Sequence, residues 1–93
     1  MEVTFNPIEK ENIEGLHFPE TDVLTDKQEI NQRKNDLEKA MALGNIEHVK
    51  IQIFFEDDKE KLVVNTTVWA VTPERIVLKK GVIIPIHRIY RIV

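Results

Sequence analysis

The chain has 93 residues, of which 42% are hydrophobic and 31% are charged, and its formal net charge is −3. This length and composition are typical of one small globular domain, and they exclude a second core and a largely disordered chain. The sequence contains no cysteine and no serine, which rules out disulfides, cysteine zinc sites and the two commonest nucleophiles.

The net charge is the sum of two unlike halves. Residues 1–58 carry six Lys or Arg against fourteen Asp or Glu, a net of −8, whereas residues 59–93 carry seven against two, a net of +5. Either a basic binding face is joined to an acidic segment, or acidic and basic elements pack together and neutralise each other. Residues 1–14 lack a basic n-region and an apolar run, and no membrane span is visible, so we expect a cytoplasmic protein that does not bind membranes.

Residues 1–24 form an arm without a sustained apolar period. Pro7, Gly15 and Pro19 interrupt it, which argues against a helix along its length. Short apolar islands remain, such as Leu16 and Phe18 on either side of His17. We expect an irregular, partly mobile arm, and two alternatives stay open for its islands: they are exposed, or they dock on the domain or on a second copy.

A helix is predicted to follow Thr25. Thr25 and Gln28 have the spacing of a capping box, and no Gly or Pro interrupts the chain until Gly44, which we expect to close the helix. A narrow apolar stripe recurs near helical spacing and consists of Ile30, Leu37, Ala40, Met41 and Leu43. This stripe either packs on the helix's own domain or binds a partner.

Residues 47–93 are predicted to form strands. Val49 to Phe55 alternates apolar and polar residues except at Phe54, and residues 61–71 form a strand long enough to require a bend or a bulge. The remaining elements are a turn at 72–74, a strand at 75–79, a tight turn at Lys80–Gly81, a strand at 82–86, one helical turn at 87–89 and a strand at 90–93.

One helix followed by five short strands predicts the fold class. We expect residues 25–93 to form a single, mainly β domain with one N-terminal helix, folded as a small five-stranded Sm-like or SH3-like barrel. Closing the sheet would leave no unpaired strand edges. The helix stripe would then cover one open end or one face of the barrel.

Candidate catalytic and metal chemistry is sparse. His17, His48 and His87 lie far apart in the sequence and have no paired-ligand spacing. The acidic run 56–58 lacks the alternating ligands and central glycine of a calcium loop, and the three glycines are isolated rather than grouped in a phosphate loop. We therefore expect no metal, no cofactor and no enzymatic activity.

The long strand at residues 61–71 suggests a binding function instead. Both of its faces carry apolar residues, although the outer face of a small barrel should be mostly polar. An apolar outer face invites another chain. We therefore predict a module for protein–protein interaction or self-association, with a protein partner or a second copy contacting Ile30, Leu37, Met41, Val63, Trp69 and Val71.

Nucleic-acid binding is the alternative function. Basic and aromatic side chains gather in the last third of the chain, and guanidinium groups beside flat rings can hold phosphates and stack bases. RNA or single-stranded DNA would then contact Arg75, Lys79, Lys80, Arg88, Tyr90 and Arg91. The competing interpretation is that Lys79 and Lys80 form only an exposed hairpin tip.

Three stretches carry a resemblance to known proteins, namely Ala42–Asn45, Thr66–Val71 and Leu78–Ile89. Through them, residues 35–93 resemble a family of small bacterial proteins of unknown function, in which a helix precedes a small barrel. That resemblance implies the fold and transfers no catalytic residues. The order of helix and barrel is also similar to that of the Rho-binding antiterminators, which are Sm-like proteins, but a likeness of fold does not assign a function.

Overall fold

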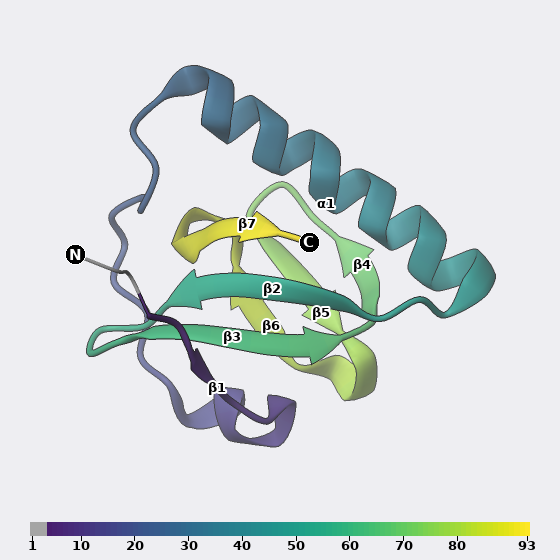
Figure 1. Ribbon diagram of the computed structural model, residues 1–93, viewed down its shortest axis with the longest axis horizontal. Coiled ribbons are helices and arrows are strands. Elements are labelled where there is room, and N and C mark those ends of the chain that lie inside the picture. The colour runs from purple at the N-terminus through teal and green to yellow at the C-terminus, as the bar shows by residue number, and fades with distance from the viewer. Residues whose placement is uncertain (1–3) are drawn as a thin grey trace.

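The computed structural model describes residues 4–93, so the first three residues of the predicted arm lie outside the described part. Figure 1 shows one long helix, α1, lying across a body of strands. Short 3₁₀ helices (η) separate some of the strands. The elements in chain order are β1 (Asn6–Pro7), η1 (Lys10–Gly15), α1 (Lys27–Glu47), β2 (Ile51–Glu56), β3 (Lys61–Thr66), β4 (Val68–Val71), β5 (Arg75–Leu78), η2 (Lys79–Gly81), β6 (Ile83–Pro85), η3 (Ile86–Arg88) and β7 (Ile89–Ile92).

The strands form two sheets, and the domain is mixed α and β. One sheet has the order β1-β3-β2-β7, and the other has the order β4-β5-β6. The prediction of a closed five-stranded barrel is therefore wrong. The physical reason is that β6 and β7, which flank η3, pair in different sheets and do not complete a ring. The short strand β1, which belongs to the predicted arm, adds a parallel pair to the outer edge of β3.

The predicted irregularity in residues 61–71 is confirmed. Thr67 separates β3 from β4, and the register between β4 and β5 shifts between Val68 and Ala70. β3 pairs with β2, whereas β4 pairs with β5. Residues 61–71 therefore contribute one strand to each sheet, because the chain changes direction at Thr67.

Both ends of α1 differ from the prediction. Asp26, not Thr25, is the N-cap, because its carboxylate accepts hydrogen bonds from the backbone N–H of Gln28 at 2.7 Å and of Glu29 at 3.4 Å. At the other end the helix continues to Glu47. The left-handed residue that ends the helix is His48, with φ 55°, and its N–H donates to the carbonyl of Gly44.

Gly44 is needed for close packing and does not end the helix. A Cβ placed on it would lie 2.5 Å from the carbonyl oxygen of Val68 and 3.0 Å from Cγ2 of Thr67. Only a residue without a side chain lets the backbone of α1 approach the start of β4 this closely. Because Gly44 has no side chain, the backbone of α1 can pack directly against the start of β4 in the second sheet.

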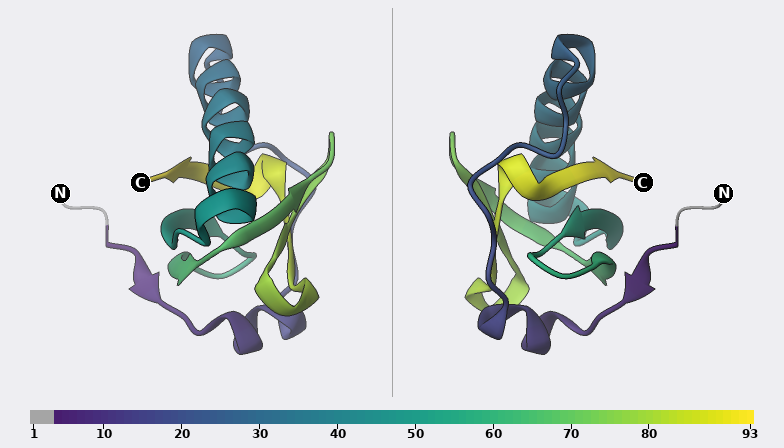
Figure 2. Two further views of the ribbon diagram at one scale, coloured as in Figure 1. Left: turned by 90° about the vertical axis from the view of Figure 1, so that its right-hand side faces the viewer. Right: turned by 90° about the vertical axis from the view of Figure 1, so that its left-hand side faces the viewer.

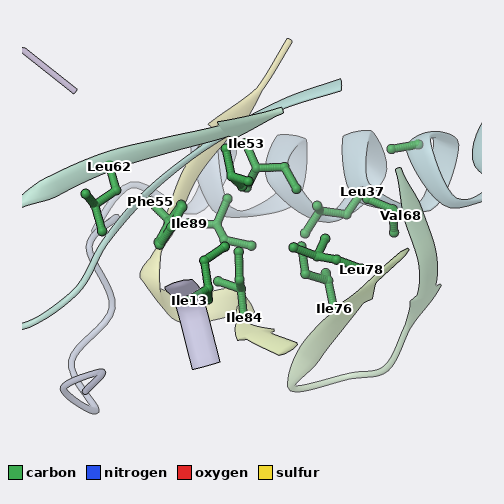
Figure 3. Close-up of a cluster of buried hydrophobic side chains, with 12 residues drawn as sticks. Ile13, Leu37, Ile53, Phe55, Leu62, Val68, Ile76, Leu78, Ile84 and Ile89 are labelled. Carbon is green, nitrogen blue, oxygen red and sulfur yellow. The ribbon is translucent and has the colours of Figure 1, made fainter. Parts of the chain in front are cut away.

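The core lies between the two sheets and the helix (Figure 3). Its members come from almost every element, including Leu37 of α1, Phe55 of β2 and Ile89 of β7. Ile13 of the arm is also 1% exposed and belongs to this cluster. Figure 2 shows β1 and η1 on the side of the body opposite α1, from where the chain returns to the start of the helix.

The contacts of the arm show where its apolar islands lie. Leu16 and Phe18 pack against the core, and backbone hydrogen bonds join Ile8 to Val63, Asp58 to His17, and Val23 to His87. The apolar islands of residues 4–24 therefore dock on the domain itself.

Candidate functional site

A hollow of about 650 Å³ lies between α1 and the turn that joins β4 to β5, and we call it the α1 groove. Ile30, Leu37 and Met41 are spaced by seven and four residues, which places them on one face of the helix. Leu37 is fully buried and forms part of the floor, whereas Ile30 and Met41 are half-buried. The other lining residues are Arg33, Lys34, Glu38, Val71, Thr72, Pro73 and Ile86.

The structure therefore divides the predicted protein-contact set. Four of its members, Ile30, Leu37, Met41 and Val71, line the α1 groove. Val63 lies elsewhere, because it pairs with Pro7 of β1 and Phe54 of β2 in the other sheet. The sequence did not single out Pro73 and Ile86, since they come from turns that approach α1 only in the folded chain.

Trp69, the remaining member, lies outside the α1 groove and is 46% exposed. It follows Val68, whose carbonyl faces Gly44, and the exposed Leu43 and Ile46 flank Gly44 on the helix. On a helical wheel Leu43 lies some 160° from Met41, on the other side of α1. Leu43, Ile46 and Trp69 are exposed apolar residues close in the chain to the contact of Gly44 with Val68, and we refer to them together as the Trp69 patch.

A second hollow, of about 620 Å³, adjoins the α1 groove. The two share Arg33, Pro73 and Ile86, so they adjoin each other at these residues. The second hollow differs in chemistry, because its other lining residues are mostly charged or polar, and we call it the polar extension. Those residues are Glu20, Asp22, Glu74, Arg75, Ile83, Pro85 and His87.

Arg33 is the charged residue at the junction of the two hollows and is 5% exposed. Its Nη1 and Nη2 donate to the two carboxylate oxygens of Asp22 at 2.9 and 2.8 Å, and Nη1 also donates to the carbonyl of Ile89 at 3.0 Å. Burial tends to raise the pKa of Asp22, but the hydrogen bonds and charge of Arg33 outweigh it and lower that pKa. The ion pair therefore ties the arm to α1 and β7 in its charged form.

The outer face of the first sheet carries an aromatic cluster. The ring of Phe5 lies edge-on to those of Phe54 and Tyr90, with centroids 5.1 and 5.6 Å apart. Arg91 lies over Phe54 at 4.8 Å, and Lys61 over Tyr90 at 5.9 Å. Phe54 is the residue that broke the alternation of its strand, and Tyr90 and Arg91 belong to the basic and aromatic group that the sequence indicated.

The hydroxyl of Tyr90 donates to the carboxylate of Glu56. Burial, and then this hydrogen bond to a carboxylate, raise the pKa of Tyr90 to about 12. Tyr90 therefore keeps its proton at neutral pH and is held in place by Glu56. Its ring remains half-buried at the surface.

The residues predicted to bind nucleic acid do not form one surface. Arg88 is buried, and its guanidinium donates to the carbonyls of Thr21, Glu56 and Asp57, which is a structural role. Lys79 and Lys80 are exposed in η2, at the far end of β5 from the exposed Arg75. Only Tyr90 and Arg91 share a surface, the aromatic cluster.

The histidines lie apart from one another. His17 is exposed on the arm, His48 caps α1, and Nε2 of His87 donates to the carbonyl of Pro19 at 2.8 Å. Within residues 4–93 no three His, Asp or Glu side chains come together as a metal site. In that same part of the chain, no helix combines the length and the apolar character needed to cross a membrane. No protein-family model, curated protein or solved structure matches this chain.

Proposed function

We propose that this protein is a non-catalytic, cytoplasmic binding module that holds an apolar segment of a partner protein in the α1 groove. The observation that carries the proposal is the groove itself, an open hollow with an apolar base formed by Ile30, Leu37 and Met41 on one side and Val71 and Pro73 on the other. Binding sites in proteins commonly combine such an apolar base with a few polar groups.

The size and rim of the groove agree with a peptide segment. Ile30 and Met41 are eleven positions apart, which corresponds to about 17 Å along the helix axis. That length accommodates about five residues of extended chain or three turns of helix. Lys34 and Glu38 stand at the rim, where they are exposed to solvent. An amphipathic helix that lays its apolar face into a groove is one such mode of recognition.

The test uses a displayed library of random dodecapeptides, selected against the protein. We expect peptides rich in large apolar residues, and we expect Met41→Glu to weaken their binding at least about tenfold, because a buried, unpaired carboxylate is costly. Leu43→Glu is the matched control, since it makes the same change on the exposed opposite side of α1. Circular dichroism checks that both variants fold.

Two results would contradict the proposal. The first is a selection that returns no apolar peptides. The second is a loss of binding in Leu43→Glu with none in Met41→Glu, which would assign the interaction to the Trp69 patch. Light scattering on the same samples measures self-association, and a dimer that is broken only by Leu43→Glu would assign that patch to a second copy.

Single-stranded nucleic acid is a second candidate ligand, supported by the aromatic cluster. Single strands bind where bases can stack on aromatic rings and cations can contact phosphates, and Phe54, Tyr90, Lys61 and Arg91 supply such rings and cations on one sheet face. We expect a labelled oligo(U) strand to bind with an affinity that falls steeply with salt. Arg91→Ala should weaken binding and Arg75→Ala should not. Fluorescence anisotropy that shows no binding at about 50 mM salt would reject this candidate.

A further inference from the structure

The α1 groove lies beside the outer edge of β4, which is an edge strand of the second sheet. β4 pairs with β5 on one side, and no strand of that sheet lies on its other side. The backbone N–H of Lys79 donates to the carbonyl of Thr67, and that of Thr72 donates to the carbonyl of Arg75. These two bonds determine which backbone groups of β4 point towards β5 and which point away from it.

Hydrogen-bonded and non-hydrogen-bonded pairs alternate along an antiparallel ladder. The pairs of Val68 with Leu78 and of Val71 with Ile76 each lie next to one of these bonds, so both are non-hydrogen-bonded pairs. The backbone N–H and C=O groups of Val68 and of Val71 therefore point to the outer edge of β4. The register shift between Val68 and Ala70 explains why these two residues are an odd number of positions apart.

α1 covers this edge at one end and leaves it open at the other. The carbonyl of Val68 meets Gly44, where the missing side chain lets the helix approach. From that contact, α1 and the hairpin of β4 and β5 diverge towards the start of the helix (Figure 2). Val71 is half-buried and lines the α1 groove, and its backbone N–H and C=O have no partner among the loops and side chains of residues 4–93.

The other edge strands carry features that block pairing, and β4 lacks them. β1 is two residues long and contains Pro7, and β6 contains Pro85, which has no N–H. In β7 the carbonyl of Ile89 already accepts a hydrogen bond from Arg33. Proteins commonly protect edge strands with short length, proline or charge, because an open edge pairs with other chains. β4 has neither proline nor a charged residue.

We propose that the segment bound in the α1 groove is extended and adds to the second sheet as a strand beside β4, exchanging two backbone hydrogen bonds with Val71. This inference rests on the proposed function and narrows the partner to one class, an apolar β-forming segment without proline at the paired residue. In strand addition, backbone hydrogen bonds supply affinity and contacts of alternate side chains supply specificity. Leu37 and Met41 of α1 line the wall that those side chains contact.

The test takes a labelled peptide recovered by the dodecapeptide selection, N-methylates it at one position at a time, and measures binding to the unmodified protein by fluorescence anisotropy. We expect one residue at which the methyl group weakens binding on the order of tenfold, because the N–H that pairs with the Val71 carbonyl is lost. Methylation of the two adjacent residues should change binding little, since their N–H groups point to the opposite edge. The selected sequences should have apolar residues at every second position.

Variants of the protein test the same contact from the other side. Val71→Pro removes the outward N–H and should weaken binding to a similar extent, and proline is tolerated on an edge strand. Val71→Ala keeps the N–H and should lose less. Ile83→Pro is the matched control, because Ile83 pairs with Val77 next to the bond from the Leu78 N–H to the Val82 carbonyl, and its own N–H therefore points to the outer edge of β6. It should bind as the unmodified protein does, and circular dichroism checks that all three variants fold.

The outcomes separate this inference from the proposed function. Apolar residues at helical spacing, with binding lost on N-methylation at any position beyond the first turn, indicate a bound helix and would overturn the inference while leaving the binding module intact. Equal losses in Val71→Pro and Ile83→Pro, or a dimer without peptide that Val71→Pro breaks, would also overturn it. A selection without apolar peptides would overturn both proposals. If Val71→Pro does not fold, the N-methylated peptides decide the question with the unmodified protein.

Discussion

Replacing Gly44 with alanine separates two opposite effects of a glycine inside a helix. Gly44 lies within α1, three residues before its end, where alanine has the better intrinsic helix propensity. On propensity alone, Gly44→Ala would stabilise the protein by about 1 kcal/mol. The structure predicts the opposite sign, because the new methyl group would meet the backbone of β4.

The magnitude follows from the contact. The Cβ would lie 2.5 Å from the carbonyl oxygen of Val68, whereas carbon and carbonyl oxygen ordinarily approach to about 3.3 Å. Val68 pairs with Leu78 in the second sheet and is fully buried, so β4 does not shift freely. Overpacking of this kind costs about 3 kcal/mol at the upper end of its usual range. After the gain in propensity, the expected net destabilisation is about 2 kcal/mol, or a fall in Tm of roughly 8–16 °C.

Thermal and urea unfolding, followed by circular dichroism at the helix band, measures this change. Gly15→Ala is the matched control, since nothing lies within 4 Å of its added Cβ, and its stability should stay within about 0.5 kcal/mol of the original protein. If Gly44→Ala proves as stable as the original protein or more stable, the close approach of α1 to β4 is not as the structure describes.

Three further predictions concern polar groups. Arg88→Leu should destabilise the fold by about 3 kcal/mol, because three backbone carbonyls lose their donor, and a urea-measured loss below about 1 kcal/mol would contradict this role. Asp22 has a pKa below its unfolded value, so its contribution is present above about pH 4 and disappears as the pH falls through the folded value. Asp22→Asn should therefore lower the free energy of unfolding at neutral pH by on the order of 2 kcal/mol. It should also make that free energy depend less on pH in the acid range, and an unchanged dependence would argue against the ion pair with Arg33. Tyr90 is the one tyrosine, so absorbance at the phenolate band should show a midpoint near pH 12, and Glu56→Gln should move that midpoint only part of the way back toward pH 10, because burial continues to raise the pKa of Tyr90. Because the folded pKa of Tyr90 is raised, the stability that Tyr90 contributes should be complete below about pH 10 and decline as the pH rises toward 12. A titration midpoint near pH 10 in the folded protein would refute the contact with Glu56.

Local patterns predicted most of the elements. The helix stripe and the alternation in residues 49–55 reflect the periods of 3.6 and 2 that any helix or half-buried strand must have. Turn residues such as Pro73 and Gly81 set the strand limits to within a residue or two, since their backbone preferences act without neighbours. The break in residues 61–71 was predictable for the same reason, because one strand of that length could not stay regular in a small domain.

The errors arose where distant segments meet. Gly44 fits a helix end in sequence, but its role depends on Val68, which is 24 residues away. Arg88 resembles an exposed cation until the carbonyls of Thr21 and Asp57 surround it. Ile13 looked like part of a loose arm because its partners in the core lie on other elements.

In the candidate site, too, local patterns were predictable and contacts between distant segments were not. The stripe of Ile30, Leu37 and Met41 was visible as one apolar face of a helix, and the sequence by itself determined that this face would be buried or bound. Whether it lines an open groove depended on how near α1 comes to the second sheet, which Gly44 permits, and on Pro73 and Ile86 forming the opposite wall. Periodicity reports which side chains share a face, because it is a property of the local backbone. What that face meets is decided by packing between segments far apart in the chain, and only the tertiary structure contains that information.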